Sequence, residues 1–199
     1  PFEEGKTTGW LDNRLKHYRT NSRKIRVVAG DVIPEQVRSE AEYHDRIFQP
    51  MFRAIAPFDP KGEMREEWLN ARGAIARFSR GSIEIRVIDS QESPAADAIV
   101  GSAIVAVVRA LTEEKWSSFH AQFEVQQSSL VAIFDDACRS ADQAIVRDRE
   151  YLLALGVDRQ EATLQEIWDD LACRIPDEVG DPLKGLVARG PLTRRMLQC

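Results

Sequence analysis

Residues 82–87 alternate between polar and apolar side chains, and a long apolar segment follows a few residues later. Along a strand, successive side chains point to opposite faces of the sheet. One face therefore holds the apolar members, which are Ile83, Ile85 and Val87. We expect this face to pack on the helix that follows, so the chain should combine strands with helices.

The apolar segment that follows is expected to form a central helix. Ser93 is a good N-cap and Pro94 suits the first helical position. The helix should run over residues 95–111 and, because it is apolar nearly all round, lie at the centre of the core. A membrane span needs about 20 apolar residues, and Arg109 ends the run, so we interpret the segment as a buried helix of a soluble protein with no membrane partner.

The remaining periodicity predicts a first half that contains strands and a second half that is helical. The expected strands cover residues 24–29, 74–78 and 82–88. The expected helices cover about 34–55, 95–111, 119–133, 140–155, 161–175 and 191–197, with a loop at 176–185. This order predicts an α+β fold in which a few antiparallel strands pack on a mainly helical second half. The strand-containing region would cover residues 1–111 and the helical tail residues 112–199, both within one domain.

Composition excludes some classes of function. The chain has 199 residues, a net charge of -5 and 43% hydrophobic residues, which fits one globular core and argues against a general nucleic-acid binder. No phosphate-binding glycine motif of the P-loop or Rossmann kind is present. Cys138, Cys173 and Cys199 are widely spaced, so we expect reduced thiols and a cytoplasmic protein.

The polar face of the segment 82–87 carries the residues of greatest chemical interest. Glu84 and Arg86 lie two residues apart, roughly 7 Å along a strand. A carboxylate suits Mg²⁺, and a guanidinium suits a phosphate oxyanion. An exposed face with a cross-strand ion pair explains the same pattern, and the alternation alone leaves both interpretations open.

Three more polar residues are candidates for binding a nucleotide or substrate anion. Arg72 precedes the key strand, where it contacts a ligand or is a surface charge. Arg19 and Asn21, with Arg23 beside them, form a polar cluster before the first expected strand. A solvated charged loop is the alternative for that cluster.

Residues 68–73 (Trp-Leu-Asn-Ala-Arg-Gly) and 81–89 (Gly-Ser-Ile-Glu-Ile-Arg-Val-Ile-Asp) resemble the second glutamate–cysteine ligase family. This family includes bacterial carboxylate–amine ligases and has a glutamine synthetase-like fold. The segments 1–9, 18–21 and 30–34 are similar to its middle region. The resemblance extends loosely from Pro1 to about Leu111, and the Glu-x-Arg strand is its most specific part.

The resemblance implies a role for each of these residues. Glu84 would bind a Mg²⁺ ion that holds ATP, and Arg86 would stabilise the transferred phosphoryl group. Arg72 falls near a substrate- or phosphate-facing position. The implied reaction phosphorylates the γ-carboxylate of glutamate, after which cysteine or another amine displaces phosphate. With cysteine the product is γ-glutamylcysteine, a step of glutathione biosynthesis.

The family places further metal-binding carboxylates in an N-terminal half that this sequence does not contain. We therefore expect residues 1–199 to be the C-terminal part of one catalytic domain, inactive alone, with the N-terminal half and small-molecule substrates as its partners. Two alternatives stay open: a non-catalytic helical interaction module, and a ligase that uses a different amine. A homo-oligomer is also left open.

Overall fold

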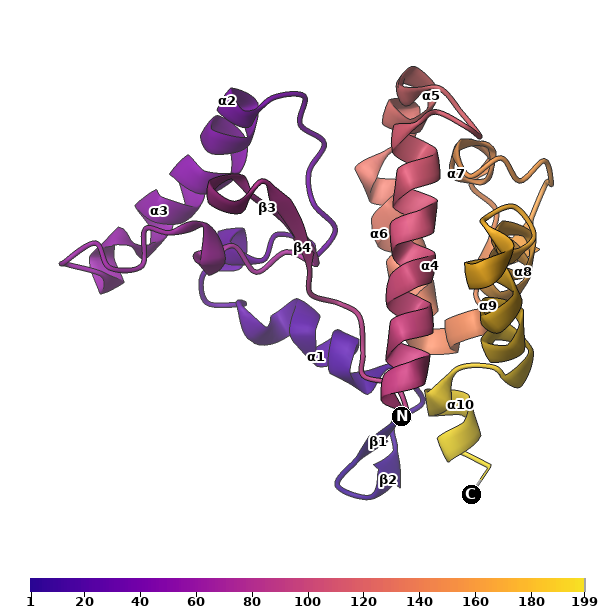
Figure 1. Cartoon of the computed structure of the whole chain (residues 1–199). Helices are drawn as coiled ribbons and strands as arrows, with labels where there is room; N and C mark the ends of the chain where they lie inside the picture. Colours follow the sequence, from indigo (N-terminus) through magenta and orange to yellow (C-terminus); the bar gives the residue numbers. More distant parts are fainter. Residues whose placement is uncertain (199) are drawn as a thin grey trace. The chain divides into compact units, whose positions relative to one another are not determined.

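The computed structural model describes residues 1–198 (Figure 1). The chain forms two compact units. Unit 1 comprises Pro1–Asn13 together with the chain from Asp89 onward, and unit 2 comprises Arg14–Ile88. Helices with small antiparallel strand pairs make up both units, which confirms the predicted α+β class. The units divide after residues 13 and 88, whereas the sequence pattern places a change near residue 111.

Unit 2 holds short helices and one hairpin. Its elements are α1 (Asn13–Asn21, whose first residue belongs to unit 1), α2 (Glu40–Tyr43), α3 (Gln49–Ile55), β3 (Ala74–Arg77) and β4 (Ser82–Ile85). A π-helical turn, His44–Phe48, joins α2 to α3. The helix expected from residue 34 begins six residues later, because the Ser39 side chain caps it by accepting a hydrogen bond from the Glu42 amide.

The strand expected over residues 24–29 is wrong. Arg26–Val28 forms a 3-10 turn, in which the Val28 amide donates to the Ile25 carbonyl at 3.0 Å. A spacing of three residues brings Ile25 and Val28 onto one side of such a turn. Both side chains pack on the core of unit 2, so the branched residues contribute to burial without a sheet.

Aromatic and aliphatic side chains from the α2–α3 segment form the core of unit 2. Its buried members are Tyr43, Ile47, Phe48, Met51, Ile55 and Leu69. The Tyr43 ring meets the rings of Phe48 and Phe78 edge-on, at centroid distances of 5.0 and 5.3 Å. Phe78 follows β3 directly, so this contact fixes the end of the hairpin against the helices.

The hairpin β3–β4 pairs Ile75 with Glu84 and Arg77 with Ser82. Residues that lie opposite each other in an antiparallel pair share a face. The apolar face of β4 is not buried as predicted, because Ile83 is 69% exposed and Ile85 is 38% exposed. The buried residue of the hairpin, Ile75 (2% exposed), lies on the same face as Glu84. The face that carries Glu84 thus holds the buried Ile75, whereas Ala76 on the opposite face packs on the core of unit 2.

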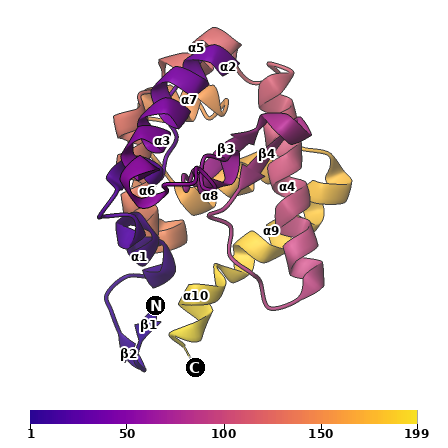
Figure 2. The same ribbon diagram turned by 90° about the vertical axis from the view of Figure 1, so that its left-hand side faces the viewer.

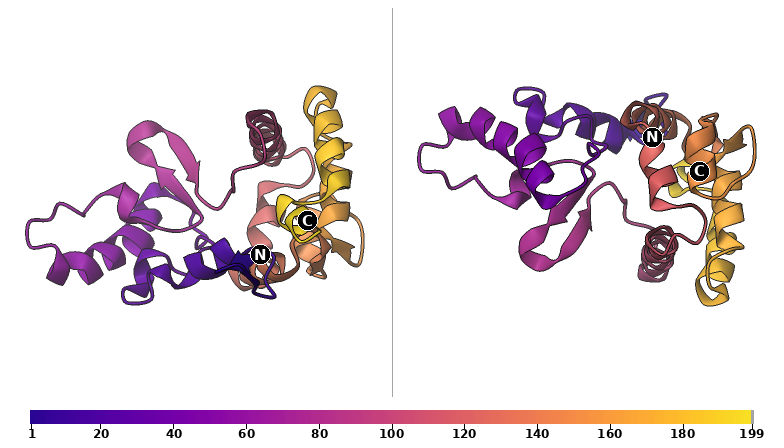
Figure 3. Two further views of the ribbon diagram at one scale, coloured as in Figure 1. Left: turned by 90° about the horizontal axis from the view of Figure 1, so that it is seen from below. Right: turned by 90° about the horizontal axis from the view of Figure 1, so that it is seen from above.

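Unit 1 contains the longest helices. Its elements are β1 (Phe2–Glu3), β2 (Lys6–Thr7), α4 (Pro94–Thr112), α5 (Phe119–Glu124), α6 (Gln127–Ser140), β5 (Ile145–Val146), α7 (Arg149–Ala154), β6 (Ala162–Thr163), α8 (Leu164–Ala172), α9 (Asp177–Arg189) and α10 (Leu192–Met196). The helix α9 contacts both α8 and α4, as Figures 2 and 3 show from further directions. The core of this unit includes Ala103, Leu152, Ile167, Leu171 and Leu183.

Three expectations for the helical tail are wrong. The helix predicted over residues 119–133 is broken at Val125 into α5 and α6. The helix predicted over 140–155 is replaced by the end of α6, the strand β5 and α7, because the Asp148 side chain caps a new helix start. The loop predicted at 176–185 is the helix α9, which includes Pro182 in its interior.

The helix α4 has the expected bounds and is less buried than expected. Its Ala103 and Val107 side chains enter the core, whereas Val105 is 57% exposed and Val108 is 41% exposed. Among the described residues, α4 is long and apolar enough to cross a membrane by length and composition alone, with 22% of the tested segment buried. The prediction of a helix central to the core therefore holds for one of its faces.

Close packing of α9 on α8 requires a glycine at residue 180. A Cβ added to Gly180 would lie 2.2 Å from the Ala172 carbonyl oxygen, whereas a Cβ at Gly185 in the same helix would meet no atom closer than 3.9 Å. We expect Gly180→Ala to lower the free energy of unfolding by about 1–3 kcal/mol. Gly185→Ala should raise it by about 0.5–1 kcal/mol. Urea unfolding followed by circular dichroism checks both, and equal stabilisation by the two changes would contradict the close contact.

Candidate functional site

The register of the hairpin gathers four charged side chains. Because Arg77 lies opposite Ser82, it is the diagonal neighbour of Glu84 on one face. Arg77 Nη1 donates to Glu84 Oε2 at 2.7 Å, and Arg86 Nε donates to Glu84 Oε1 at 2.8 Å. Arg77 Nε also donates to Glu67 Oε2 at 3.3 Å. We call Glu67, Arg77, Glu84 and Arg86 the charged cluster.

The segment before β3 fixes the second arginine of the charged cluster. Arg86 Nη1 donates to the Asn70 carbonyl at 2.7 Å, and Nη2 donates to the Trp68 carbonyl at 3.3 Å. The Arg86 amide also donates to the Gly73 carbonyl at 2.8 Å, which continues the pairing of the hairpin past the end of β4. The predicted pair is therefore brought together on an extended segment. Glu84 is its more exposed member, with 40% of the side chain exposed against 21% for Arg86.

Neighbouring donors keep the carboxylates of the charged cluster ionised. The hydrogen bond from Arg86 lowers the pKa of Glu84 below its ordinary value, and Arg77 acts in the same direction. For Glu67, partial burial opposes ionisation, but hydrogen bonds from Ser79 and Arg77 outweigh it and the pKa is again lowered. The cluster is an alternation of two negative and two positive charges.

Arg72 lies inside unit 2, away from solvent. Its side chain is 1% exposed and forms a two-pronged ion pair with Glu35, at 2.5 and 2.6 Å. Arg72 Nη1 donates to the Val27 carbonyl and to Asn70 Oδ1. A Cβ at Gly30, whose φ is +55°, would approach the guanidinium to 3.1 Å, so the turn closes tightly on it. These contacts favour a structural role, and the predicted ligand contact of Arg72 stays a prediction.

The remaining predicted residues lie at the end of α1. Arg19 is in the last turn of this helix and is partly buried, and Asn21 ends the helix and is exposed. Residues 14–26 contain six Arg or Lys residues and no Asp or Glu. Their proposed contact with a nucleotide stays a prediction, as does the solvated-loop alternative.

Unit 2 is basic although the whole chain is acidic. Residues 14–88 contain fifteen Arg or Lys residues and ten Asp or Glu residues, against a net charge of -5 for the complete sequence. Excess positive charge raises the local concentration of anionic ligands. The unit that carries the Glu-x-Arg segment is thus the one with the charge that suits an anion.

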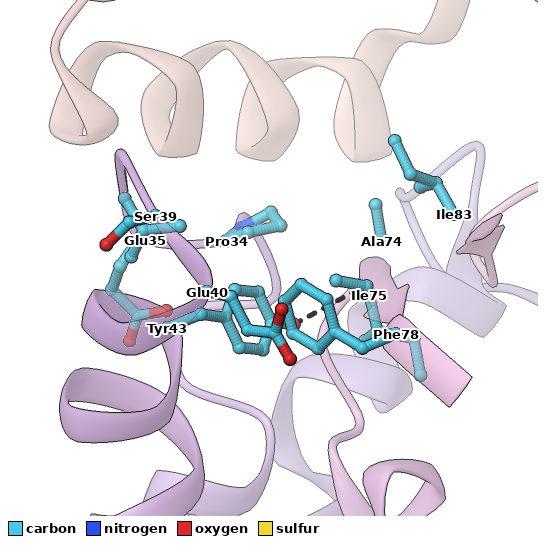
Figure 4. A pocket seen from close by; sticks show the side chains of 11 residues that line it. Pro34, Glu35, Ser39, Glu40, Tyr43, Ala74, Ile75, Phe78 and Ile83 are labelled. Carbon is cyan, nitrogen blue, oxygen red and sulfur yellow. Dashed lines mark hydrogen bonds between the residues drawn. The ribbon is translucent and has the colours of Figure 1, made fainter. Parts of the chain in front are cut away.

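An apolar pocket of about 350 Å³ opens beside the hairpin (Figure 4). It is lined by Pro34, Val37, Tyr43, Ala74, Ala76, Phe78 and Ile83 among others, with Glu35, Ser39 and Glu40 as its polar members. No Arg or Lys lines it. The pocket therefore lacks the positive charge that a phosphate would need, and it takes no part in the proposed phosphate site.

The described residues do not form a metal site by themselves. They contain no group of three or more His, Cys, Asp or Glu side chains that could hold a metal ion. Both oxygens of Glu84 accept from arginines, so positive side chains already occupy the one predicted metal ligand in this structure. Mg²⁺ is held through oxygen ligands in near-octahedral geometry. Glu84 as a metal ligand therefore stays a prediction that needs further ligands.

Two of the predicted cysteines are described. Cys138 is buried and Cys173 is exposed, and no disulfide joins these two residues. The reduced state of the cysteines stays a prediction. Cys199 lies outside the described residues.

Acid should weaken unit 2. The pKa values of Glu35, Glu67 and Glu84 are lowered from the ordinary value of 4.5. Below that value the unfolded chain binds protons that the folded chain does not, so their stabilisation is complete above pH 4.5 and lost as the pH falls through the lowered values. We expect a lower urea midpoint at about pH 3.5 than at about pH 7, and a smaller difference in Glu35→Gln. Identical midpoints at both pH values would contradict this assignment.

Comparison with known proteins gives the family. The model of glutamate-cysteine ligase family 2 matches residues 1–178, so the likeness extends well past Leu111 into the helical tail. An Archaeoglobus fulgidus protein described as uncharacterized is 38% identical over 117 residues, which cover 57% of this chain and 30% of that protein. The chain therefore matches less than a third of this relative's length. No solved structure matches.

The family match covers both the charged cluster and the basic segment before it. It is independent of the side-chain contacts, and it agrees with the resemblance seen in residues 68–73 and 81–89. The chain belongs to glutamate-cysteine ligase family 2.

Proposed function

We propose that this chain supplies part of the phosphate end of the active site in an ATP-dependent ligase that joins a carboxylate to an amine. One observation carries the proposal: Glu84 and Arg86 emerge together from one extended segment in a chain of this family. The positive charge of unit 2 supports it, because the phosphates of ATP are anionic.

The proposed reaction has two steps. The terminal phosphoryl group of ATP passes to the γ-carboxylate of glutamate, which leaves ADP and an acyl phosphate. The nitrogen of cysteine, or of a related amine, then attacks the acyl carbon and displaces phosphate, with loss of a proton. Phosphoryl transfer depends mainly on positioning and on neutralising charge. Within this chain, Arg86 would bind a phosphoryl oxygen through its guanidinium, and Glu84 would orient Arg86.

ATP and Mg²⁺ are the cofactors that the family implies. When bound, Mg²⁺ neutralises phosphate charge. The described residues do not complete a metal site, so the proposal includes further carboxylates from the rest of a longer catalytic domain. The share of the Archaeoglobus relative that lies outside the match supports a longer domain. Residues 1–199 alone would then release no phosphate from ATP.

A screen of amines tests the proposal. The complete gene product would be incubated with ATP, Mg²⁺, glutamate and single amines, cysteine among them, with phosphate release as the readout. We expect release that depends on one amine and is lost in Glu84→Gln. The control is Arg80→Lys, since Arg80 is exposed in the turn between β3 and β4. Phosphate release that persists in Glu84→Gln, or no release with any amine, would overturn the proposal.

A non-catalytic interaction module is the second candidate function. The exposed apolar side chains of Ile83 and Val105, at 69% and 57%, favour it. Absence of ATP-dependent turnover in the screen, together with a stable complex with another protein, would support this candidate. The cytoplasmic location and a homo-oligomer remain predictions under either candidate, and the small-molecule substrates remain a prediction of the ligase candidate.

A further inference from the structure

The Glu-x-Arg pattern leaves out one arginine that contacts the same carboxylate. Arg77 Nη1 reaches Glu84 Oε2 at 2.7 Å, and Arg86 Nε reaches Glu84 Oε1 at 2.8 Å, so each oxygen has a different arginine as its donor. We propose that Arg77 is a positioning residue, which holds the Glu84 carboxylate between two guanidinium groups. This inference rests on the proposed function of the Glu84–Arg86 pair.

Arg77 is itself held firmly enough to act in this way. Only 12% of its side chain is exposed, and its Nε donates to Glu67, whose side chain is 19% exposed. Glu67 in turn accepts from the Ser79 amide at 3.1 Å and from the Ser79 hydroxyl at 2.8 Å. Ser79 lies in the turn that joins β3 to β4, so the anchor of Arg77 belongs to the hairpin that carries Glu84.

The two arginines have different surroundings, which separates their roles. Arg86 is bonded to the carbonyls of Trp68 and Asn70, which are neutral acceptors. Arg77 is bonded to two carboxylates, Glu67 and Glu84. An anion that binds Arg86 and weakens its contact with Glu84 would therefore leave Arg77 paired with the carboxylate. Glu84 then keeps a counter-charge and its orientation during that exchange. Outer partners of this kind commonly change activity by about 10–100-fold when they are removed.

Nuclear magnetic resonance on the 199-residue chain tests the contact without any ligand. We expect Arg77→Lys to shift the Arg86 Nε–H resonance and to increase the mobility of the Glu84 side chain, since an ammonium lacks the planar fork that spans two carboxylates. Arg80→Lys, in the same turn, should leave both signals unchanged. Arg77→Met serves as a second variant. Unchanged Glu84 and Arg86 signals in Arg77→Lys would overturn the inference.

Kinetics on the complete gene product test the role. We expect Arg77→Lys to lower kcat about 10–100-fold, while its melting temperature and its KM for glutamate stay close to those of the wild type. If Arg77→Lys has the kcat of the wild type while Glu84→Gln is inactive, the positioning role of Arg77 is overturned. The proposed function is not contradicted by that result. A wild type without ATP-dependent turnover overturns the proposed function, and the catalytic role of Arg77 with it.

Discussion

Arg72→Met should lower the free energy of unfolding of unit 2 by about 3 kcal/mol, because it leaves the partly buried carboxylate of Glu35 without its partner. The Arg72 side chain is 1% exposed, and its guanidinium contacts Glu35, Val27 and Asn70. The change also removes hydrogen bonds to the partly buried Val27 carbonyl and to the buried Asn70 Oδ1, which adds to the effect. Urea unfolding at neutral pH, followed by the amide signals of β3 and β4, measures the change.

Two variants distinguish this effect from a general loss of positive charge. Arg80→Met removes the same charge from an exposed turn and should change stability by less than about 0.5 kcal/mol. Glu35→Gln keeps a polar partner for Arg72 and should fall between the two. A stability of Arg72→Met within about 1 kcal/mol of the wild type would contradict the structural role. Arg72 would then be available for the ligand contact that the sequence predicts.

Arg86→Lys in the complete gene product should lower kcat about 100-fold, as expected when one donor to a developing negative charge is lost. A lysine ammonium retains the charge, but it cannot contact Glu84 while donating to the carbonyls of Trp68 and Asn70 from one planar group. Phosphate release under saturating ATP, glutamate and amine measures the change.

Arg80→Lys again provides the control, with turnover expected at the wild-type level. The melting temperature of Arg86→Lys should be recorded beside its kcat, because Arg86 also joins β4 to the preceding segment. Wild-type turnover in a folded Arg86→Lys protein would remove Arg86 from the proposed phosphate site. If turnover in Arg86→Lys falls only in proportion to the amount of folded protein, Arg86 has a structural role alone.

The register of the hairpin explains why Arg77 was missed. The expected strands, 74–78 and 82–88, place Phe78 next to Ser82, and that pairing puts Arg77 on the face away from Glu84. In the structure Arg77 pairs with Ser82, because Phe78–Gly81 form the connection and Gly81 adopts a φ of +57°. A shift of one residue exchanges the faces of a strand. Alternation in one strand therefore identifies Glu84 and Arg86, whereas their neighbours depend on a turn that periodicity does not determine.

Burial was predictable where local pattern governs it and was not where distant segments meet. The start of α4 follows from Ser93 and Pro94, which act within one turn. The burial of Arg72 depends on its ion pair with Glu35, which is 37 positions away in the chain. No local sequence pattern indicates that pairing. The exposure of Ile83 likewise follows from which face of the hairpin is covered. Family membership was accessible from the motif because it depends on sequence alone.

The ion pair of Arg72 has a consequence for how unit 2 opens. Its guanidinium contacts Glu35 and Val27, which lie 37 and 45 positions before it in the chain. Asn70 links the two arginines, because its side-chain oxygen accepts from Arg72 and its backbone carbonyl accepts from Arg86. Fraying of the residues around Val27 would thus remove one hydrogen-bond acceptor from the buried Arg72 guanidinium. Hydrogen exchange should then show the amides of Arg26–Val28 and of β3 opening together with a shared free energy, as one cooperative unit.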